Sequence, residues 1–301
     1  MSEHSTLHVH DLSGTAPAPD APLLLAVHGI TANGLSWTAL AAEVRRRRGP
    51  GAVRFLAPDL RGRGSSPVVG EPDGLAGHVA DLVELIRATG APRTVVVGAS
   101  MGAFVGALLA AGHPDTIDGL VLVDGGLALA LPPDQDVDTI LAGLLGPVLD
   151  RLSMTFASPE DYEAFFEPHP ALGPLLRGPQ KQQVLDYLRH DCRPSATEPG
   201  RWASSCDLGA IRRDGADTVV DAELPLAVHK AAAAGVPIEF LWAERGLLNQ
   251  PVGLYNPQLL AALDVPISVR QTFVPGSNHY SIMFDDAGVT ATADAIDRLL
   301  A

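Results

Sequence analysis

The sequence has little cysteine, few basic residues and no long apolar run, and each shortage narrows the classes of protein to which it can belong. Its 301 residues include two cysteines and no Cys-x-x-Cys pair, too few ligands for a usual zinc site. Lysine and arginine number 21 against 35 aspartates and glutamates, and the net charge of −14 argues against nucleic acid or an anionic membrane as partner. The longest apolar stretches, such as FVGALLAAG at 104–112, are shorter than the about 20 residues that span a bilayer.

Motifs for cofactor binding and for targeting are also missing. There is no P-loop, no Gly-x-Gly-x-x-Gly follows the first predicted strand, and no clustered set of histidine and acidic residues suggests a metal. The N-terminal MSEHSTLHVH is polar and has no apolar signal core. We therefore expect a cytoplasmic protein that acts on a small molecule without a metal, another cofactor or a membrane. The sequence carries no signal for the oligomeric state.

Strand and helix patterns alternate at both ends of the chain. Residues 22–29 (PLLLAVHG) form an almost unbroken apolar run, as in a strand buried on both faces, and residues 75–90 follow a helical period that ends at a glycine. Such alternation predicts an α/β fold, with a mostly parallel sheet flanked by helices. Further strands are expected at 7–14, 52–60, 93–100, 117–126, 236–244 and 268–276, and further helices at 36–47, 101–113 and 285–301.

The middle of the chain has a different character. Residues 127–232 contain many prolines and aspartates, several short helical stretches and no clear buried strand. They are predicted to be a helical insert in a core domain formed by 1–126 and 233–301. The one basic run, Arg45–Arg48, ends a predicted core helix and is expected to be a solvated helix end.

A lone hydroxyl, Ser100, lies in GASMG (98–102) between a predicted buried strand and a predicted helix. A Gly-x-Ser-x-Gly pentamer alone is a weak signal, but this strand–turn–helix setting is that of a nucleophile elbow. The small neighbours let strand and helix approach, and the serine side chain then projects above the sheet. Two backbone N–H groups are the expected donors to a developing oxyanion: that of Met101 at the helix N-terminus, and that of Ile30 in the loop VHGIT.

A nucleophilic serine needs a base, and the base needs an orienting acid. Of the ten histidines, His279 follows the last predicted strand, at the edge of the sheet where α/β sites lie, and is the expected base. His28 is expected to shape its loop instead. Asp124, which ends LVLVD, and Glu244, which ends FLWAE, are both candidates for the acid. Asp124 is favoured because its strand directly follows the Ser100 strand, and neighbouring strands lie about 4.8 Å apart.

Together these segments resemble the α/β-hydrolase superfamily over nearly the whole chain. The matching features stand in the family order serine, acid, histidine. They are HGIT at 28–31 with Trp37 downstream, DLRGRGSS at 59–66, GASMG at 98–102, LVLVDG at 120–125 and PGSNH at 275–279. One place departs from the pattern: where the family often carries an aspartate after the penultimate strand, this chain has Gly246.

The resemblance also assigns a place to the insert. In this superfamily a helical cap covers the serine, and residues 127–232 have the position and size of such a cap. Its aromatic residues would give an apolar substrate pocket, and those expected to contact substrate are Phe156, Phe165, Phe166 and Trp202.

The predicted function is a serine hydrolase that cleaves carboxylic esters or lactones of neutral, fairly hydrophobic substrates through an acyl-enzyme on Ser100. Carbon–carbon bond hydrolases, peptidases and perhydrolases with the same serine-based site are open alternatives. So is a ligand-binding protein without catalysis on the same scaffold, because fold does not fix function. Dehalogenases and epoxide hydrolases of the superfamily need a carboxylate at the elbow, where this chain has serine.

Overall fold

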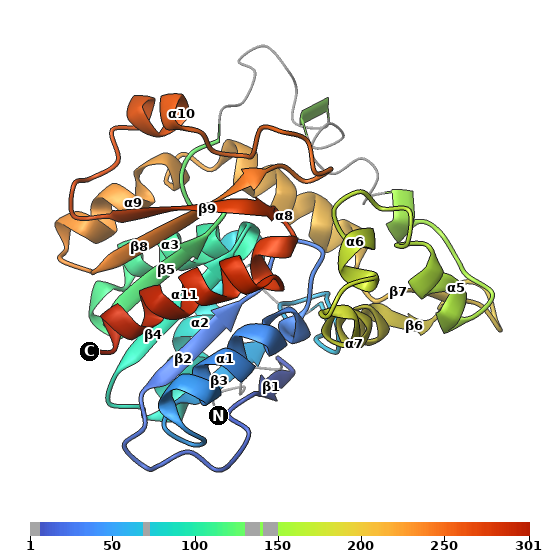
Figure 1. The fold of residues 1–301 in the computed structure, drawn as a ribbon, viewed down its shortest axis with the longest axis horizontal. Coiled ribbons are helices and arrows are strands. Elements are labelled where there is room, and N and C mark those ends of the chain that lie inside the picture. Colours follow the sequence, from blue (N-terminus) through green and yellow to red (C-terminus); the bar gives the residue numbers. More distant parts are fainter. Residues whose placement is uncertain (1–6, 69–72, 130–138, 141–149) are drawn as a thin grey trace.

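The computed structural model describes residues 7–68, 73–129, 139–140 and 150–301, and its centre is a seven-stranded sheet (Figure 1). The strand order is β1-β3-β2-β4-β5-β8-β9; β1 runs antiparallel to β3, and all other neighbouring pairs are parallel. The predicted mostly parallel sheet is confirmed. The strands are β1 (Val9–Asp11), β2 (Leu23–Val27), β3 (Arg54–Pro58), β4 (Thr94–Ala99), β5 (Gly119–Val123), β8 (Ile238–Arg245) and β9 (Arg270–Asn278).

The central strands are apolar because helices cover both faces of the sheet. Every residue of β2, β4 and β5 is buried, as expected for parallel strands with no face toward solvent. On one face lie α1 (Thr38–Arg48) and α11 (Asp286–Leu299); on the other lie α2 (Gly74–Thr89), α3 (Met101–Gly112) and α9 (Leu224–Ala233) (Figure 1). Shorter helices lie in the connections: η1 (Gly34–Trp37), η2 (Pro114–Thr116), α10 (Pro257–Ala262) and η3 (Ser281–Met283). No helix in the described ranges is long and apolar enough to cross a membrane.

A smaller lobe lies beside the sheet (Figure 1). It contains α5 (Pro159–Ala164), α6 (Gly173–Leu176), α7 (Lys181–Asp191) and a hairpin of β6 (Cys192–Pro194) and β7 (Trp202–Ser204). A buried ion pair joins Arg151 to Asp191 inside the lobe, and the Tyr162 hydroxyl donates to the same carboxylate. α7 also rests on η1 of the core, where the Asn33 side chain donates to the carbonyl oxygen of Tyr187 at 3.0 Å.

The segment predicted as an insert, 127–232, also contains two longer helices beyond the lobe. α8 (Leu208–Val220) packs on α2 and α9 packs on α3, so residues 208–232 extend the helical layer of the core. The described part of the lobe ends before α8. An apolar helix face predicts burial, but the sequence does not say which neighbour covers it. Residues 130–138 and 141–149, which the same prediction includes, lie outside the described residues.

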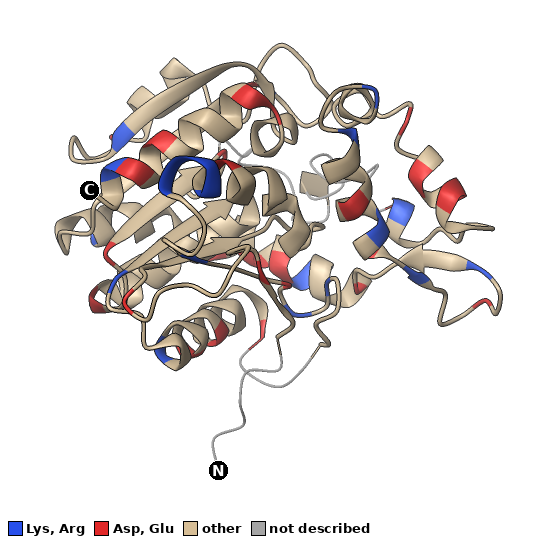
Figure 2. Cartoon of the chain, turned by 60° about the horizontal axis from the view of Figure 1, so that its bottom comes forward, with Lys and Arg blue, Asp and Glu red and all other residues tan. Residues whose placement is uncertain are grey.

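The arginine run at the end of α1 takes part in an ion-pair network: Arg46 is exposed, as expected of a solvated helix end, whereas Arg47 and Arg48 are largely paired. Arg47 bonds Asp294 and Asp297 of α11 at 2.6 and 3.0 Å, and Arg48 bonds Asp297 at 2.7 Å. Figure 2 shows this basic end of α1 among acidic positions. The balancing carboxylates lie on the last helix of the chain, so a local pattern around the arginines could not reveal them.

Candidate active site

Ser100 occupies a sharp turn between β4 and α3, and its backbone is strained. Its φ of 53° and ψ of −122° belong to neither helix nor strand, a conformation that costs roughly 1–3 kcal/mol and persists only where the surroundings enforce it. A Cβ atom at Gly98 would lie 2.2 Å from the carbonyl oxygen of Gly102, and a Cβ atom at Gly102 would lie 2.2 Å from that of Val27. The turn can therefore close against β2 only because both flanking residues are glycine.

His279 lies between Ser100 and Asp124. Its Nε2 is 3.1 Å from Ser100 Oγ, and its Nδ1 is 2.6 Å from Asp124 Oδ2. Asp124 is buried directly after β5, the sheet neighbour of β4, and its Oδ1 accepts the Ala243 N–H at 3.0 Å. The three side chains follow β4, β5 and β9, which the parallel topology brings to one edge. This arrangement can move a proton from a hydroxyl to an imidazole whose orientation a carboxylate fixes.

The turn that carries His279 is fixed by one carboxylate. Asp285 accepts hydrogen bonds from the hydroxyls of Ser277, at 2.8 Å, and Ser281, at 2.7 Å, on the two sides of His279. It also caps α11 by accepting the Gly288 N–H at 2.7 Å. Asp285 is thus a positioning residue that the sequence analysis missed. The available signal was an aspartate at the first position of a predicted helix, which is typical of an N-cap.

Glu244, the alternative acid, lies away from the imidazole. It is exposed in β8, and its carboxylate accepts the Gly276 N–H at 2.7 Å, which ties β8 to β9. In the described part of the chain, no hydrogen bond joins Glu244 to His279. The structure therefore brings Asp124, and not Glu244, to the histidine.

His28 is buried beneath the loop that contains Ile30, and both of its ring nitrogens are occupied. Nδ1 bonds the Gly29 carbonyl oxygen at 2.8 Å, and Nε2 accepts the Leu60 N–H at 2.9 Å. Burial lowers the pKa of His28 to about 4, so the ring is neutral near neutral pH. These contacts fit a residue that shapes the loop.

The DLRGRGSS segment does more than form a turn. Arg63 is fully buried; its Nε donates to the Ile30 carbonyl oxygen at 2.9 Å, and its Nη1 lies 2.5 Å from Asp214 of α8. The guanidinium therefore fixes the residue whose N–H is an expected oxyanion donor. The other expected donor belongs to Met101, the first residue of α3. The use of these two N–H groups stays a prediction.

Asp59, at the start of the same segment, is a second buried acid. Its carboxylate accepts the backbone N–H groups of Gly34 and Ser65 at 2.9 and 2.8 Å, and bonds the rings of His10 and His190 at 3.2 and 2.7 Å. Burial favours the protonated acid, but these hydrogen bonds outweigh it and hold the pKa of Asp59 well below its usual range.

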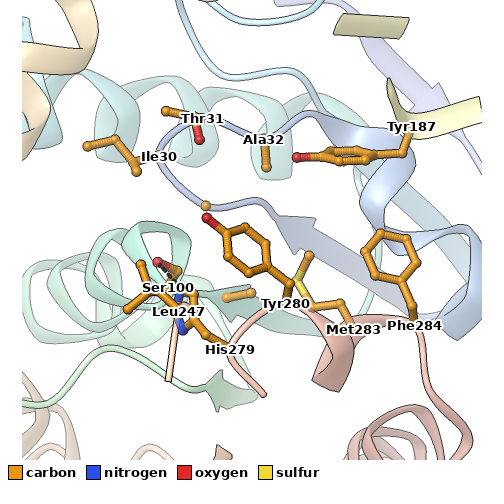
Figure 3. A pocket seen from close by; sticks show the side chains of 12 residues that line it. Ile30, Thr31, Ala32, Ser100, Tyr187, Leu247, His279, Tyr280, Met283 and Phe284 are labelled. Atoms are coloured by element: carbon orange, nitrogen blue, oxygen red, sulfur yellow. Dashed lines mark hydrogen bonds between the residues drawn. The ribbon is translucent and has the colours of Figure 1, made fainter. Parts of the chain in front are cut away.

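Two largely apolar cavities meet at Ser100 and His279. The first runs from the serine past the loop at 29–32 toward α7 of the lobe (Figure 3). The second opens between α3 and α8. Apart from Asp124 and His279, the described lining residues carry no ionisable charge near neutral pH. The side chains of the first cavity include Ile30, Ala32, Tyr187, Leu247, Tyr280, Met283 and Phe284, and those of the second include Ile30, Met101, Phe104, Leu129, Val219 and Leu254.

Two of the four aromatic residues predicted for the pocket lie near it. Phe165 and Phe166 line a third cavity in the lobe. That cavity shares Thr31, Tyr187 and Tyr280 with the first one, so a long substrate could extend from the serine toward both phenylalanines.

Phe156 and Trp202 pack within the framework of the lobe, and their role as substrate contacts stays a prediction. They line none of these three cavities. The Phe156 N–H bonds the Trp202 carbonyl oxygen at 2.7 Å, and the Phe156 ring packs edge-to-face on Tyr162 with 5.0 Å between centroids. Aromatic content predicts an apolar interior, but it does not separate the wall of a cavity from the packing behind it.

Three residues that the sequence did not single out also line the first cavity: Tyr187, Tyr280 and Phe284. Tyr280 directly follows the predicted base, and that adjacency was a usable signal. Tyr187 comes from α7, and only the tertiary fold brings it to the serine. Its position shows that the lobe contributes to the candidate site (Figure 3).

Known proteins resemble the chain in sequence and in fold. Residues 22–147 match the family described as alpha/beta hydrolase fold. Lipase LipV of Mycobacterium tuberculosis is 36% identical over 123 residues, which are 41% of this chain and 43% of that protein. The structure of E-2-(acetamidomethylene)succinate hydrolase has a TM-score of 0.72 at 20% identity and covers 97% of this chain and 95% of its own. The thioesterase domain from the curacin biosynthetic pathway has a TM-score of 0.67 at 20% identity, with coverages of 94% and 92%.

The chain has the α/β-hydrolase fold, and its residues 22–147 match the sequence family described by that fold. Its match with LipV spans less than half of that protein's length, and the likeness to the two solved structures, at 20% identity, concerns the fold alone. A reaction for this chain must therefore be argued from its own site.

Proposed function

We propose that the protein is a serine hydrolase that cleaves carboxylic esters or lactones of neutral, fairly hydrophobic substrates through an acyl-enzyme on Ser100. The observation that carries this proposal is the position of the His279 ring, 3.1 Å from Ser100 Oγ and 2.6 Å from Asp124. A strained turn that presents a hydroxyl to an oriented imidazole is the arrangement that nucleophilic catalysis requires.

In the first half of the reaction, Ser100 Oγ attacks the carbonyl carbon while His279 Nε2 takes the hydroxyl proton. The N–H groups of Ile30 and Met101 stabilise the negative charge that develops on the carbonyl oxygen. His279 then gives its proton to the leaving alkoxide, and the acyl group stays on the serine. In the second half, His279 takes a proton from water, the water oxygen attacks the acyl carbon, and Ser100 leaves with the proton. Asp124 holds the Nδ1–H throughout.

The substrate class follows from the cavities on the two sides of the serine. Their described walls are largely aliphatic and aromatic, and they offer no cation to an anionic substrate. Arg151 borders the third cavity, but Asp191 neutralises it. An uncharged acyl group and an uncharged leaving group fit these walls best. The name of LipV, a lipase, is consistent with acyl transfer from an oxygen ester.

The same three side chains also serve carbon–carbon bond hydrolysis, peptide hydrolysis and perhydrolysis, and these are the alternatives within the scaffold. A binding protein without catalysis is the alternative outside enzymology. The close contact of His279 with Ser100 favours an enzyme, because a binding pocket needs no general base beside a strained serine.

The test is a hydrolysis screen with p-nitrophenyl esters of increasing chain length and with small and macrocyclic lactones. Ser100→Ala should lose about 10⁴-fold or more in turnover, the scale of a lost triad member. A fluorophosphonate probe should label Ser100, as mapped by peptide mass spectrometry. Ser153→Ala, at an exposed serine, is the control and should keep turnover and labelling. Normal turnover in Ser100→Ala would refute the proposal, whereas labelling of Ser100 without ester or lactone hydrolysis would favour the alternative reactions.

A further inference from the structure

Three histidines surround the buried Asp59 at the junction of core and lobe. His8 and His10 come from the N-terminal segment, Asp59 follows β3, and His190 lies near the end of α7. The rings are close: centroids are 4.6 Å apart for His8 and His10, and 4.7 Å apart for His10 and His190. None of these residues lines the cavities at Ser100, so the mechanism above does not use them.

Local structure explains why His8, His10 and Asp59 lie close together. His8 and His10 are two residues apart in extended chain, so their side chains point to the same face. β1 pairs with β3 in the register Val9↔Pro58, which brings Asp59 beside them, and the Asp59 N–H donates to the His8 carbonyl oxygen at 2.8 Å. The sequence HVH is thus placed against the carboxylate by backbone pairing.

The geometry of this group is that of a metal-ligand set. One ring nitrogen each of His8 and His10 and one carboxylate oxygen of Asp59 lie within 4.8 Å of one another. The separation between His10 Nε2 and Asp59 Oδ1 is 3.2 Å. Two ligands of a tetrahedral zinc ion with bonds of about 2.0–2.1 Å lie about 3.3 Å apart, so this pair needs almost no movement. His8 is exposed, and its ring has room to close the remaining distance.

Asp59 is held as a metal-bound carboxylate usually is. Its oxygens accept the N–H groups of Gly34 and Ser65, and His190 Nε2 lies 2.7 Å from Oδ2. Such outer contacts orient a ligand before the ion arrives, and their removal typically weakens metal affinity by about 10–100-fold.

We propose that His8, His10 and Asp59 form a binding site for a zinc ion or a similar divalent transition metal, with His190 as a positioning residue. Two imidazoles and a carboxylate suit such an ion, and water fills its remaining position. The site connects core and lobe, because His190 lies on α7, one helical turn after Tyr187, whose ring lines the first cavity. A bound ion would therefore stabilise the contact between the core and α7, the helix that carries Tyr187.

The experiment uses untagged, chelator-treated full-length protein titrated with Zn²⁺ by calorimetry, and with Co²⁺ by visible absorption. His8→Asn is the decisive variant, because it removes a ligand while the bonds of Asp59 to His10 and His190 stay in place. The wild type should bind one equivalent of Zn²⁺, and His8→Asn should bind it at least about tenfold more weakly and lose the Co²⁺ absorption of a low-coordinate site. His190→Asn should weaken binding but keep the shape of the Co²⁺ spectrum, because all three ligands remain.

His113→Asn, at a histidine on the end of α3, is the matched control and should bind both ions as the wild type does. Circular dichroism and thermal melting of each variant show whether it is folded before titration. The proposal is overturned if the wild type binds no Zn²⁺ in the micromolar range. It is equally overturned if folded His8→Asn binds Zn²⁺ as tightly as the wild type, because the ion then lies at other surface groups.

Discussion

Replacing Asp124 by asparagine should remove most of the turnover, and the hydrogen bonds of this residue predict how. Asp124 Oδ1 accepts the Ala243 N–H at 3.0 Å, and Oδ2 lies 2.6 Å from His279 Nδ1. In Asp124→Asn, the amide oxygen must face the Ala243 N–H, because an NH₂ group cannot accept that bond. The NH₂ group is then directed at His279 Nδ1, which must become an acceptor.

That reversal changes the tautomer of the imidazole. With Nδ1 as acceptor, the proton of the neutral ring resides on Nε2, the atom 3.1 Å from Ser100 Oγ. The ring can then no longer accept the serine proton. We expect kcat to fall by about 10²–10⁴-fold, which corresponds to roughly 3–5 kcal/mol of transition-state stabilisation. KM should change little, because Asp124 orients the base and need not contact the acyl chain.

The matched control is Glu244→Gln. A glutamine oxygen can still accept the Gly276 N–H, so kcat should stay within about tenfold of the wild type. Both variants are assayed on one p-nitrophenyl ester, and thermal melts check that each is folded. A folded Asp124→Asn with kcat within tenfold of the wild type would refute the tautomer argument. A larger loss in Glu244→Gln than in Asp124→Asn would move the acid to Glu244.

Three further predictions concern stability and the lobe. His28 has a pKa of about 4 in the folded protein and about 6.5 in the unfolded chain, so its contribution to the free energy of unfolding should be fully present above pH 6.5 and fall by about 3 kcal/mol as the pH drops to 4. Urea titrations at different pH values should show this loss, and in His28→Asn the pH dependence should be weaker. Gly102→Ala should lower the free energy of unfolding by at least about 2 kcal/mol, because the added Cβ atom clashes with β2. Gly112→Ala, in the same helix with open space around it, should change the free energy of unfolding by less than about 1 kcal/mol, and equal melting temperatures of the two variants would contradict this. Phe165→Ala should change the ratio of kcat/KM between long and short esters with little change in melting temperature, whereas Phe156→Ala should lower the melting temperature and leave that ratio nearly unchanged. Identical behaviour of the two variants would mean that the third cavity does not contact substrate.

The sheet and the neighbourhood of Ser100 were predictable because both depend on local patterns with strict geometry. Buried strands are recognisable as apolar runs, and parallel topology then forces their carboxyl ends to one edge. Ser100 and Asp124 each directly follow a buried strand, and His279 directly follows the last strand of the same sheet, so the order of strands was enough to expect them together. The choice between Asp124 and Glu244 needed only the neighbour relation of two consecutive strands.

The lobe was less predictable, because its contacts depend on how helices turn against one another. Phe156 and Phe165 stand in the same aromatic-rich stretch, yet one packs inside the lobe and the other borders a cavity. The group of histidines around Asp59 could not be predicted from the sequence for a related reason. Its four members come from positions 8, 10, 59 and 190, and no spacing rule connects a strand, a turn and a distant helix. The expectation that no metal-ligand cluster exists rested on sequence proximity alone.

The guanidinium of Arg63 matters for any attempt to evolve this protein in the laboratory. It bonds Ile30 beside the serine and Asp214 on α8, and α8 also supplies Thr218 and Val219 to the second cavity. Selection for heat tolerance and selection for a new substrate would thus act on the same few bonds, and α8 variants should show the two traits changing together. On the lobe side of the first cavity, Tyr187 and Phe165 make no hydrogen bond with Arg63 in the described residues. Mutant libraries that aim to change selectivity while leaving the Arg63 bonds untouched therefore have their best starting points at Tyr187 and Phe165.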